Sequence, residues 1–177
     1  MRYAKLIQVA EVYKLKQELI MRYEYNDGGR ADGGFKGSTG DCVTRAISIA
    51  TGLPYKKVYQ DLFDLANDHK MNKNDFVAKR MRKARSSSLN STSPRYGVDK
   101  VVYSKYIESL GWTWKPTMLI GQGCKVHLRE HELPSGRIIC KVSRHLVAVV
   151  DGIINDTYDC SRRGSRCVYG YWYMESK

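Results

Sequence analysis

The sequence lacks the features that would place the protein in or across a membrane. No apolar run is long enough to predict a transmembrane helix, and Lys5, Glu11 and Lys14 interrupt the N-terminal segment where a secretory signal would be apolar. Five cysteines without such a signal favour a reducing compartment and mostly free thiols. We therefore expect a cytoplasmic protein that is neither secreted nor associated with a membrane.

Acidic residues are scarce relative to basic ones. The chain has 18 Asp and Glu against 30 Lys and Arg, which gives a net charge of +12. A charge of this size favours an acidic partner such as nucleic acid or an acidic protein surface, although many basic proteins use it only for solubility. The 177 residues are enough for one core, so we expect a single domain over 1–177.

Common nucleotide and metal motifs are also missing. The glycine-rich loop 26–40 has no Gly-Lys-Ser/Thr sequence, which a phosphate-binding loop of the P-loop type requires. Cys124, His127 and His131, with Cys140 as a fourth ligand, suggest zinc, but their spacing is not that of a standard zinc finger. We interpret Cys140 as a core residue of a strand and predict neither a metal nor an organic cofactor.

The sequence does contain a cysteine at the start of a predicted helix. Asp41 or Thr39 can cap this helix, and Gly52 followed by Pro54 ends it. Unpaired N–H groups and the helix dipole favour a thiolate in the first turn, so Cys42 is a candidate nucleophile. The alternative is a small buried residue. The buried stripe of the helix has the expected spacing and consists of Val43, Ala46, Ile47 and Ala50.

A second signal lies far downstream, where two β-branched runs flank Asp151-Gly152. This dipeptide strongly predicts a two-residue hairpin turn. In the resulting register His145 and Asp156 share a face as diagonal neighbours, whereas Asn155 points to the other face. Cys42, His145 and Asp156 then supply a nucleophile, a base and an orienting carboxylate. The structural alternative, considered for each residue by itself, is that His145 is a core histidine and that Asp156 caps a turn.

The remaining patterns predict an α+β fold in which N-terminal helices pack on a C-terminal antiparallel sheet of about four to six strands. The cleft would lie between the helices and the sheet. Apolar periodicity and turn residues give helices over 1–20, 55–68 and 99–110, a short strand at 23–25, and strands at 112–114, 138–142 and 168–173.

A basic, serine-rich stretch at 70–97 is predicted to be a mobile insertion, with an arm for nucleic acid or an acidic protein as the functional alternative. A second basic loop runs from Cys160 to Cys167, whose separation permits a disulfide that a reducing compartment would disfavour. The arginines proposed to bind a partner are Arg80, Arg82, Arg85, Arg162, Arg163 and Arg166.

The order of these signals resembles the papain-like cysteine peptidase fold, and the Asp41-Cys42 entry into the helix is most similar to its C39-like branch. The resemblance covers roughly Phe35 to Trp172. The sequence segments 25–30, 41–46 and 145–152 also resemble those of an uncharacterised protein family common in bacteriophages and prophages. The first resemblance implies a Cys-His-Asp thiol protease. The second implies a phage-encoded protein in the host cell cytoplasm and brings no known activity.

One position departs from the papain-like pattern. Such enzymes usually carry a Gln six residues before the cysteine to complete the oxyanion hole, and here that position is Lys36. Three alternatives are open: Lys36 stabilises the oxyanion as a cation, Asn26 or Ser38 supplies the missing hydrogen-bond donor, or the oxyanion hole is incomplete.

We predict a hydrolase of the peptidase or isopeptidase kind that acts on an amide or thioester bond of a peptide or protein substrate. An acyl transferase would use the same residues. The alternative is a non-catalytic basic module on a papain-like scaffold, which binds nucleic acid or an acidic host protein. Lys36 in place of Gln and the arginine-rich segments favour this alternative.

Overall fold

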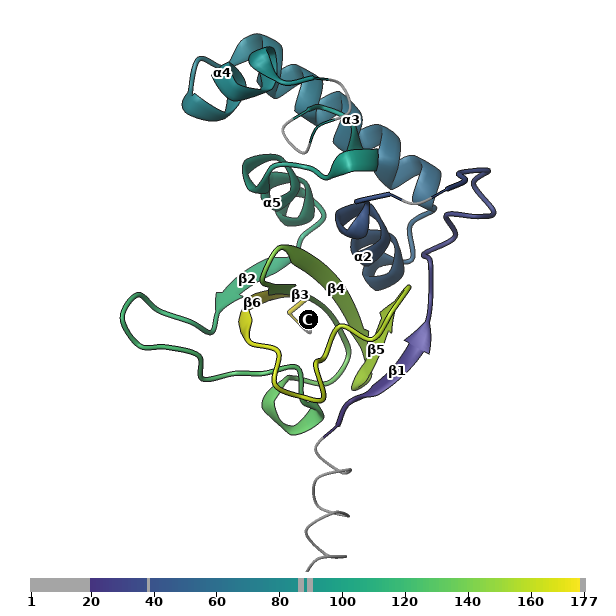
Figure 1. Cartoon of the computed structure of the whole chain (residues 1–177), viewed down its shortest axis with the longest axis vertical. Coiled ribbons are helices and arrows are strands. Elements are labelled where there is room, and N and C mark those ends of the chain that lie inside the picture. The colour runs from purple at the N-terminus through teal and green to yellow at the C-terminus, as the bar shows by residue number, and fades with distance from the viewer. Residues whose placement is uncertain (1–19, 38, 86–87, 89–90, 176–177) are drawn as a thin grey trace, which may run out of the picture.

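The computed structural model describes residues 20–37, 39–85, 88 and 91–175, and within them it has a mixed α+β fold. The α-helices lie on one side of a curved six-stranded sheet (Figure 1). The predicted helix at 1–20 lies outside the described residues apart from Ile20. Within the described ranges, no helix combines the length and the apolar character needed to cross a membrane.

The sheet has the order β1-β5-β4-β3-β6-β2 and contains one parallel pair. β1 runs parallel to β5, whereas the other pairs are antiparallel. The sequence predicted an antiparallel sheet, but β1 and β5 are separated by helices α2 to α5 and strands β2 to β4, a crossover long enough to bring the chain back in the same direction. The strands are β1 (Arg22–Tyr25), β2 (Thr113–Pro116), β3 (Arg137–Val142), β4 (His145–Val150), β5 (Ile153–Asp156) and β6 (Val168–Tyr173).

The helix that begins with Cys42 covers the centre of the sheet. Its apolar stripe, which includes Ile47 and Ala50, packs in one core with Leu146 and Ala148 of β4. Gly52 ends it in the left-handed conformation, as predicted, and its N–H donates to the carbonyl of Ser48. The helices are α2 (Cys42–Thr51), α3 (Tyr55–Asn72), α4 (Phe76–Lys83) and α5 (Lys100–Ser109).

The predicted hairpin joins β4 to β5. Asp151 and Gly152 both have positive φ, as a type I′ turn requires, and Val149 pairs with Ile154. Because the turn fixes this register, His145 begins β4 close to where Asp156 ends β5.

The segment 70–97 contains more structure than the sequence predicted. α3 extends to Asn72, and Asp75 caps α4 by accepting a hydrogen bond from the Ala78 N–H at 2.8 Å. Ala78 and Met81 of α4 are buried. A short 3₁₀ helix, η1 (Pro94–Tyr96), leads toward α5. The described part of this segment is therefore a packed helical layer rather than a free arm.

Candidate active site

Cys42 is half-buried at the first position of α2 and lines an open cavity of about 750 Å³. The cavity is formed by the loop before α2, the start of α5 and the β3–β4 turn. Asp41 occupies the N-cap position, but its side chain makes no capping hydrogen bond. The helix start therefore leaves its first N–H groups free for another acceptor, including the N–H of Cys42 itself.

His145 and Asp156 meet as the hairpin register predicts. His145 Nε2 lies 2.5 Å from Asp156 Oδ2, and both side chains are buried. Cys42 and His145 line the same cavity, and since Nε2 is engaged by the carboxylate, Nδ1 is the ring nitrogen that remains for the thiol of Cys42. The ring of Tyr158 covers the imidazole at a centroid distance of 5.3 Å. Three elements thus bring the predicted nucleophile, base and carboxylate together.

The electrostatics of this cluster favour the charged pair. Burial alone would raise the pKa of Cys42, but the hydrogen bond to His145, the imidazolium charge, the Leu146 N–H and Arg45 together lower it. Burial would lower the pKa of His145, but its bonds to Asp156, Cys160 and Cys42 raise it instead. These opposite shifts of the two pKa values move the pair toward thiolate and imidazolium.

A buried arginine holds the two halves of the site together. Arg45 pairs through Nη1 with Asp41, the neighbour of the nucleophile, and through Nη2 with Asp156 Oδ1 at 3.2 Å. The aspartates are almost fully buried, and the Arg45 side chain is only 9% exposed. One guanidinium therefore links the start of α2 to the end of β5.

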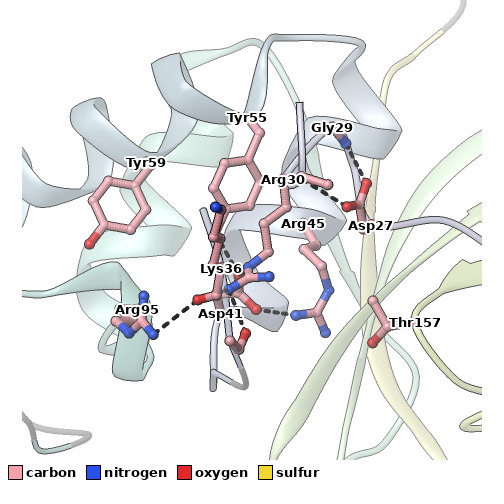
Figure 2. Close-up of polar contacts among 12 residues, drawn as sticks. Asp27, Gly29, Arg30, Lys36, Asp41, Arg45, Tyr55, Tyr59, Arg95 and Thr157 are labelled. Carbon is pink, nitrogen blue, oxygen red and sulfur yellow. Dashed lines mark hydrogen bonds and ion pairs between the residues drawn. The ribbon is translucent and has the colours of Figure 1, made fainter. Parts of the chain in front are cut away.

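The glycine-rich loop is anchored to the same charges (Figure 2). Arg30 Nε lies 2.9 Å from Asp41 Oδ2, and the Tyr55 hydroxyl donates to that oxygen at 2.5 Å. Arg30 also donates to the carbonyl of Lys36 at 3.0 Å, which receives a further bond from Arg95 at 3.1 Å. The loop conformation therefore depends on the carboxylate next to Cys42.

The rim of the cavity is basic. Lys100, Lys141 and Arg144 line it, and among the described ion pairs these three cations have no carboxylate partner. Burial and the neighbouring charge of Lys100 lower the pKa of Lys141. Arg80 also lines the cavity but pairs with Asp99. Asp99 is the one carboxylate among the residues described as lining the cavity, so the rim carries an excess of positive charge near the thiol.

Of the residues predicted to complete the oxyanion hole, the described Lys36 and Asn26 do not line the cavity of Cys42. Lys36 is exposed and does not line the cavity. Its backbone carbonyl accepts hydrogen bonds from Arg30 and Arg95. Asn26 donates to Asn155 Oδ1 at 3.0 Å and lines a different cavity beside α2. Ser38 lies outside the described residues. The Cys42 N–H is the donor that the fold itself provides.

The arginines predicted to bind a partner have diverse surroundings. Arg80 is paired with Asp99, Arg82 donates to the carbonyls of Lys70 and Lys73, and Arg166 donates to that of Ser143. These three arginines therefore already use some of their hydrogen-bond donors for contacts within the protein. Arg85, Arg162 and Arg163 are exposed.

One metal-capable cluster coincides with the proposed catalytic residues. The ligand atoms of His145, Asp156 and Cys160 lie within 4.8 Å of one another, and all three residues are buried. A cation bound there would take the nitrogen and oxygen that His145 and Asp156 share. Metal binding and the proposed catalysis would therefore exclude each other.

Sequence reasoning missed Arg45, Arg30, Tyr55 and Cys160. The Asp41–Arg45 spacing is a recognisable i,i+4 pair on a helix, so it carried a signal. Nothing in the local pattern pointed to the other three, because their partners are distant in sequence.

We predict that Arg45→Met strongly destabilises the fold. The substitution keeps much of the side-chain volume but leaves Asp41 and Asp156 buried without their shared cation, which costs about 3–5 kcal/mol of unfolding free energy. Urea denaturation measures the loss. The matched control is Arg22→Met, which breaks an exposed pair with Glu24 and should cost less than about 1 kcal/mol. Equal losses would show that Arg45 is not the link described here.

We also predict that iodoacetamide alkylates Cys42 with a pH midpoint below that of free cysteine, whose thiol titrates at about 8.5. Mass spectrometry of the labelled peptide gives the rate. Asp156→Asn removes the charge that keeps the pKa of His145 high, so the pKa of Cys42 should rise and its rate at pH 6 should fall at least about tenfold. Asp151→Asn, in the exposed turn, is the control. An ordinary midpoint for Cys42 would contradict the thiolate pair.

Comparison with known proteins adds no family to this geometry. No protein-family model, curated protein or solved structure matches the chain. The papain-like and phage resemblances therefore remain expectations, and the roles assigned to these residues are argued from their arrangement alone.

Proposed function

We propose that the protein is a cysteine-nucleophile hydrolase that cleaves an amide or related acyl bond. The observation that carries the proposal is that Cys42 and His145 line one cavity, while Asp156, from the strand paired with that of His145, holds the buried side of the imidazole at 2.5 Å. Each group has the partner that its role requires. The thiol has a base, and the base has a carboxylate that fixes its orientation.

The chemistry proceeds in two balanced steps. The Cys42 thiolate attacks the carbonyl carbon, and as the tetrahedral intermediate collapses His145 gives its Nδ1 proton to the departing amine, which leaves a thioester. His145, now neutral, removes a proton from water, which attacks the thioester and releases the acid and the thiolate. The Cys42 N–H at the start of α2 donates to the oxyanion in both steps. A transferase would differ only in using an amine or hydroxyl in place of water.

The basic rim indicates the class of substrate. Lys100, Lys141 and Arg144 surround the entrance to the thiol, so a substrate with a carboxylate or phosphate near the scissile bond would be drawn to it. We therefore propose acidic peptides or other anionic acyl compounds as substrates.

The activity is tested by acyl-enzyme trapping with an activated ester of an N-blocked glutamate. Intact-mass spectrometry should find one acyl group on Cys42, and ester turnover should vanish in Cys42→Ala. His145→Gln should slow turnover by about 10²–10⁴-fold, since it removes the general base and acid. His131→Gln, an exposed histidine outside the cavity, should leave it unchanged.

Two outcomes of this experiment would overturn the proposal. One is acylation spread over lysines at equal rates. The other is turnover that persists at the wild-type rate in Cys42→Ala.

The proposed preference for anions can be measured without a natural substrate. Iodoacetate and iodoacetamide modify the same thiolate but differ in charge, so their rate ratio at Cys42 reports the local field. We expect the ratio to exceed that of free cysteine at low salt and to fall about fivefold in Lys141→Gln, about 1 kcal/mol for one nearby charge. Lys105→Gln, an exposed lysine of α5 outside the cavity, is the control. A ratio independent of Lys141 and of salt would refute the anionic preference.

The second candidate function is a binding module for nucleic acid or an acidic protein. The net charge and the exposed Arg85, Arg162 and Arg163 favour it. Binding of this kind would weaken steeply with salt and survive Cys42→Ala. The acylation test separates the two functions, because a binding module has no need of a depressed thiol pKa.

A further inference from the structure

A second group of sulfur and imidazole ligands lies outside the catalytic cavity. Cys124 and Cys167 are joined by a disulfide between the loop after β2 and the start of β6, with their Cα atoms 5.9 Å apart. His127 Nε2 lies 3.5 Å from Cys124 Sγ. Two sulfur atoms and one ring nitrogen therefore meet at one surface point, and Cys124 is exposed to solvent. The zinc set considered from the sequence included Cys140, which is fully buried in β3 beside Cys160, as its interpretation as a core residue predicted.

The backbone holds His127 and Cys167 together without the disulfide. His127 and Cys167 form an antiparallel β-bridge. The Leu128 N–H donates to the Arg166 carbonyl at 2.9 Å, and the Val168 N–H donates to the Val126 carbonyl at 2.8 Å. Leu128 and Val168 are fully buried on either side of the bridge. Reduction of the disulfide would therefore leave the Cys167 thiol and the imidazole side by side, with Cys124 only three residues before His127 in the chain.

The imidazole is oriented as a metal ligand. His127 Nδ1 lies 3.1 Å from Glu132 Oε2, an oxygen that also accepts from the His127 backbone N–H at 2.6 Å. Because Nδ1–H donates to this carboxylate, the lone pair is on Nε2, which lies beside Cys124 Sγ. A carboxylate behind the ligating histidine is the usual second contact in zinc sites.

We propose that Cys124, His127 and Cys167 form a zinc site when the disulfide is reduced, with a fourth position open to water. Zinc favours thiolate and imidazole nitrogen in tetrahedral sites. A phosphine and water reduce the disulfide to two thiols and yield the phosphine oxide, and zinc then displaces the two thiol protons. A cellular dithiol would supply the same two electrons and two protons and become a disulfide. The site is therefore empty when oxidised and available when reduced.

The same surface point contains a weaker ligand that we do not assign to zinc. Met118 Sδ lies 3.9 Å from Cys167 Sγ. A thioether suits softer cations than zinc, so Met118 is expected to cover the site rather than to coordinate the ion.

The test uses the full chain with His145→Gln, because this substitution disables the other metal-capable cluster at His145, Asp156 and Cys160. The protein is reduced with a phosphine, the phosphine is removed without air, and Zn²⁺ is titrated against a chromophoric chelator. We expect one zinc per chain after reduction and none before it. Co²⁺ in place of zinc should give the thiolate-to-metal absorbance that two sulfur ligands produce.

Matched variants identify the ligands. Cys124→Ser and His127→Gln should weaken zinc binding at least about 100-fold, and Glu132→Gln about 10–100-fold by loss of the oriented histidine. His131→Gln changes an exposed neighbour and should have no effect. Circular dichroism checks that each variant is folded. If a ligand variant unfolds, the zinc affinity of Glu132→Gln alone decides whether His127 is a ligand. Absence of zinc binding after reduction, or equal affinity in wild-type and Glu132→Gln proteins, would overturn the proposal.

Discussion

The pairing of Arg45 with two buried aspartates is the constraint on which the rest of the site depends. Isolated charges are costly to remove from water, and Arg45 is the cation that the buried Asp41 and Asp156 share, beside the separate partners Arg30 and His145. Asp41 precedes the nucleophile, whereas Asp156 orients the imidazole. The same ion pairs that make the fold possible therefore also set the distance between α2 and the hairpin.

The charge balance of this cluster explains why a proton can move within it. Arg30 and Arg45 offset the charges of Asp41 and Asp156. The pair of Cys42 and His145 is neutral both as thiol and imidazole and as thiolate and imidazolium, so the whole cluster has no net charge in either form. Transfer of the proton leaves the total charge unchanged. Gain or loss of a proton from solvent would instead create a net charge in a buried region. The network thus favours exchange inside the pair over titration of either member.

The fold and the triad were predictable where the signal was local. The turn at Asp151-Gly152 and the alternation of side chains along two strands fixed the meeting of His145 with Asp156. The bounds of α2 followed from its stripe and from Gly52. Features that depend on distant contacts were not predictable. Examples are the parallel pairing of β1 with β5 and the disulfide of Cys124 with Cys167, since cysteine connectivity does not follow from spacing.

The misplaced oxyanion residues illustrate the same limit. Lys36 stands six residues before the cysteine, but sequence distance fixes position only along regular structure. The loop from Asn26 to Gly37 turns back on itself around Arg30, whose side chain pairs with Asp41, and Lys36 does not line the cavity of the thiol. Buried charge, rather than spacing, determines where the loop residues lie.

The basic rim and the triad have separate roles in the proposed reaction. Lys141 and Arg144 would attract the anionic group of the substrate equally well before and during the reaction, and binding that does not strengthen in the transition state leaves the chemical step unchanged. The same cations would also hold the carboxylate that hydrolysis produces, so they favour slow product release. The rim therefore selects the substrate, whereas the rate of bond cleavage depends on the thiolate and on the Cys42 N–H, whose interactions strengthen as charge develops on the carbonyl oxygen.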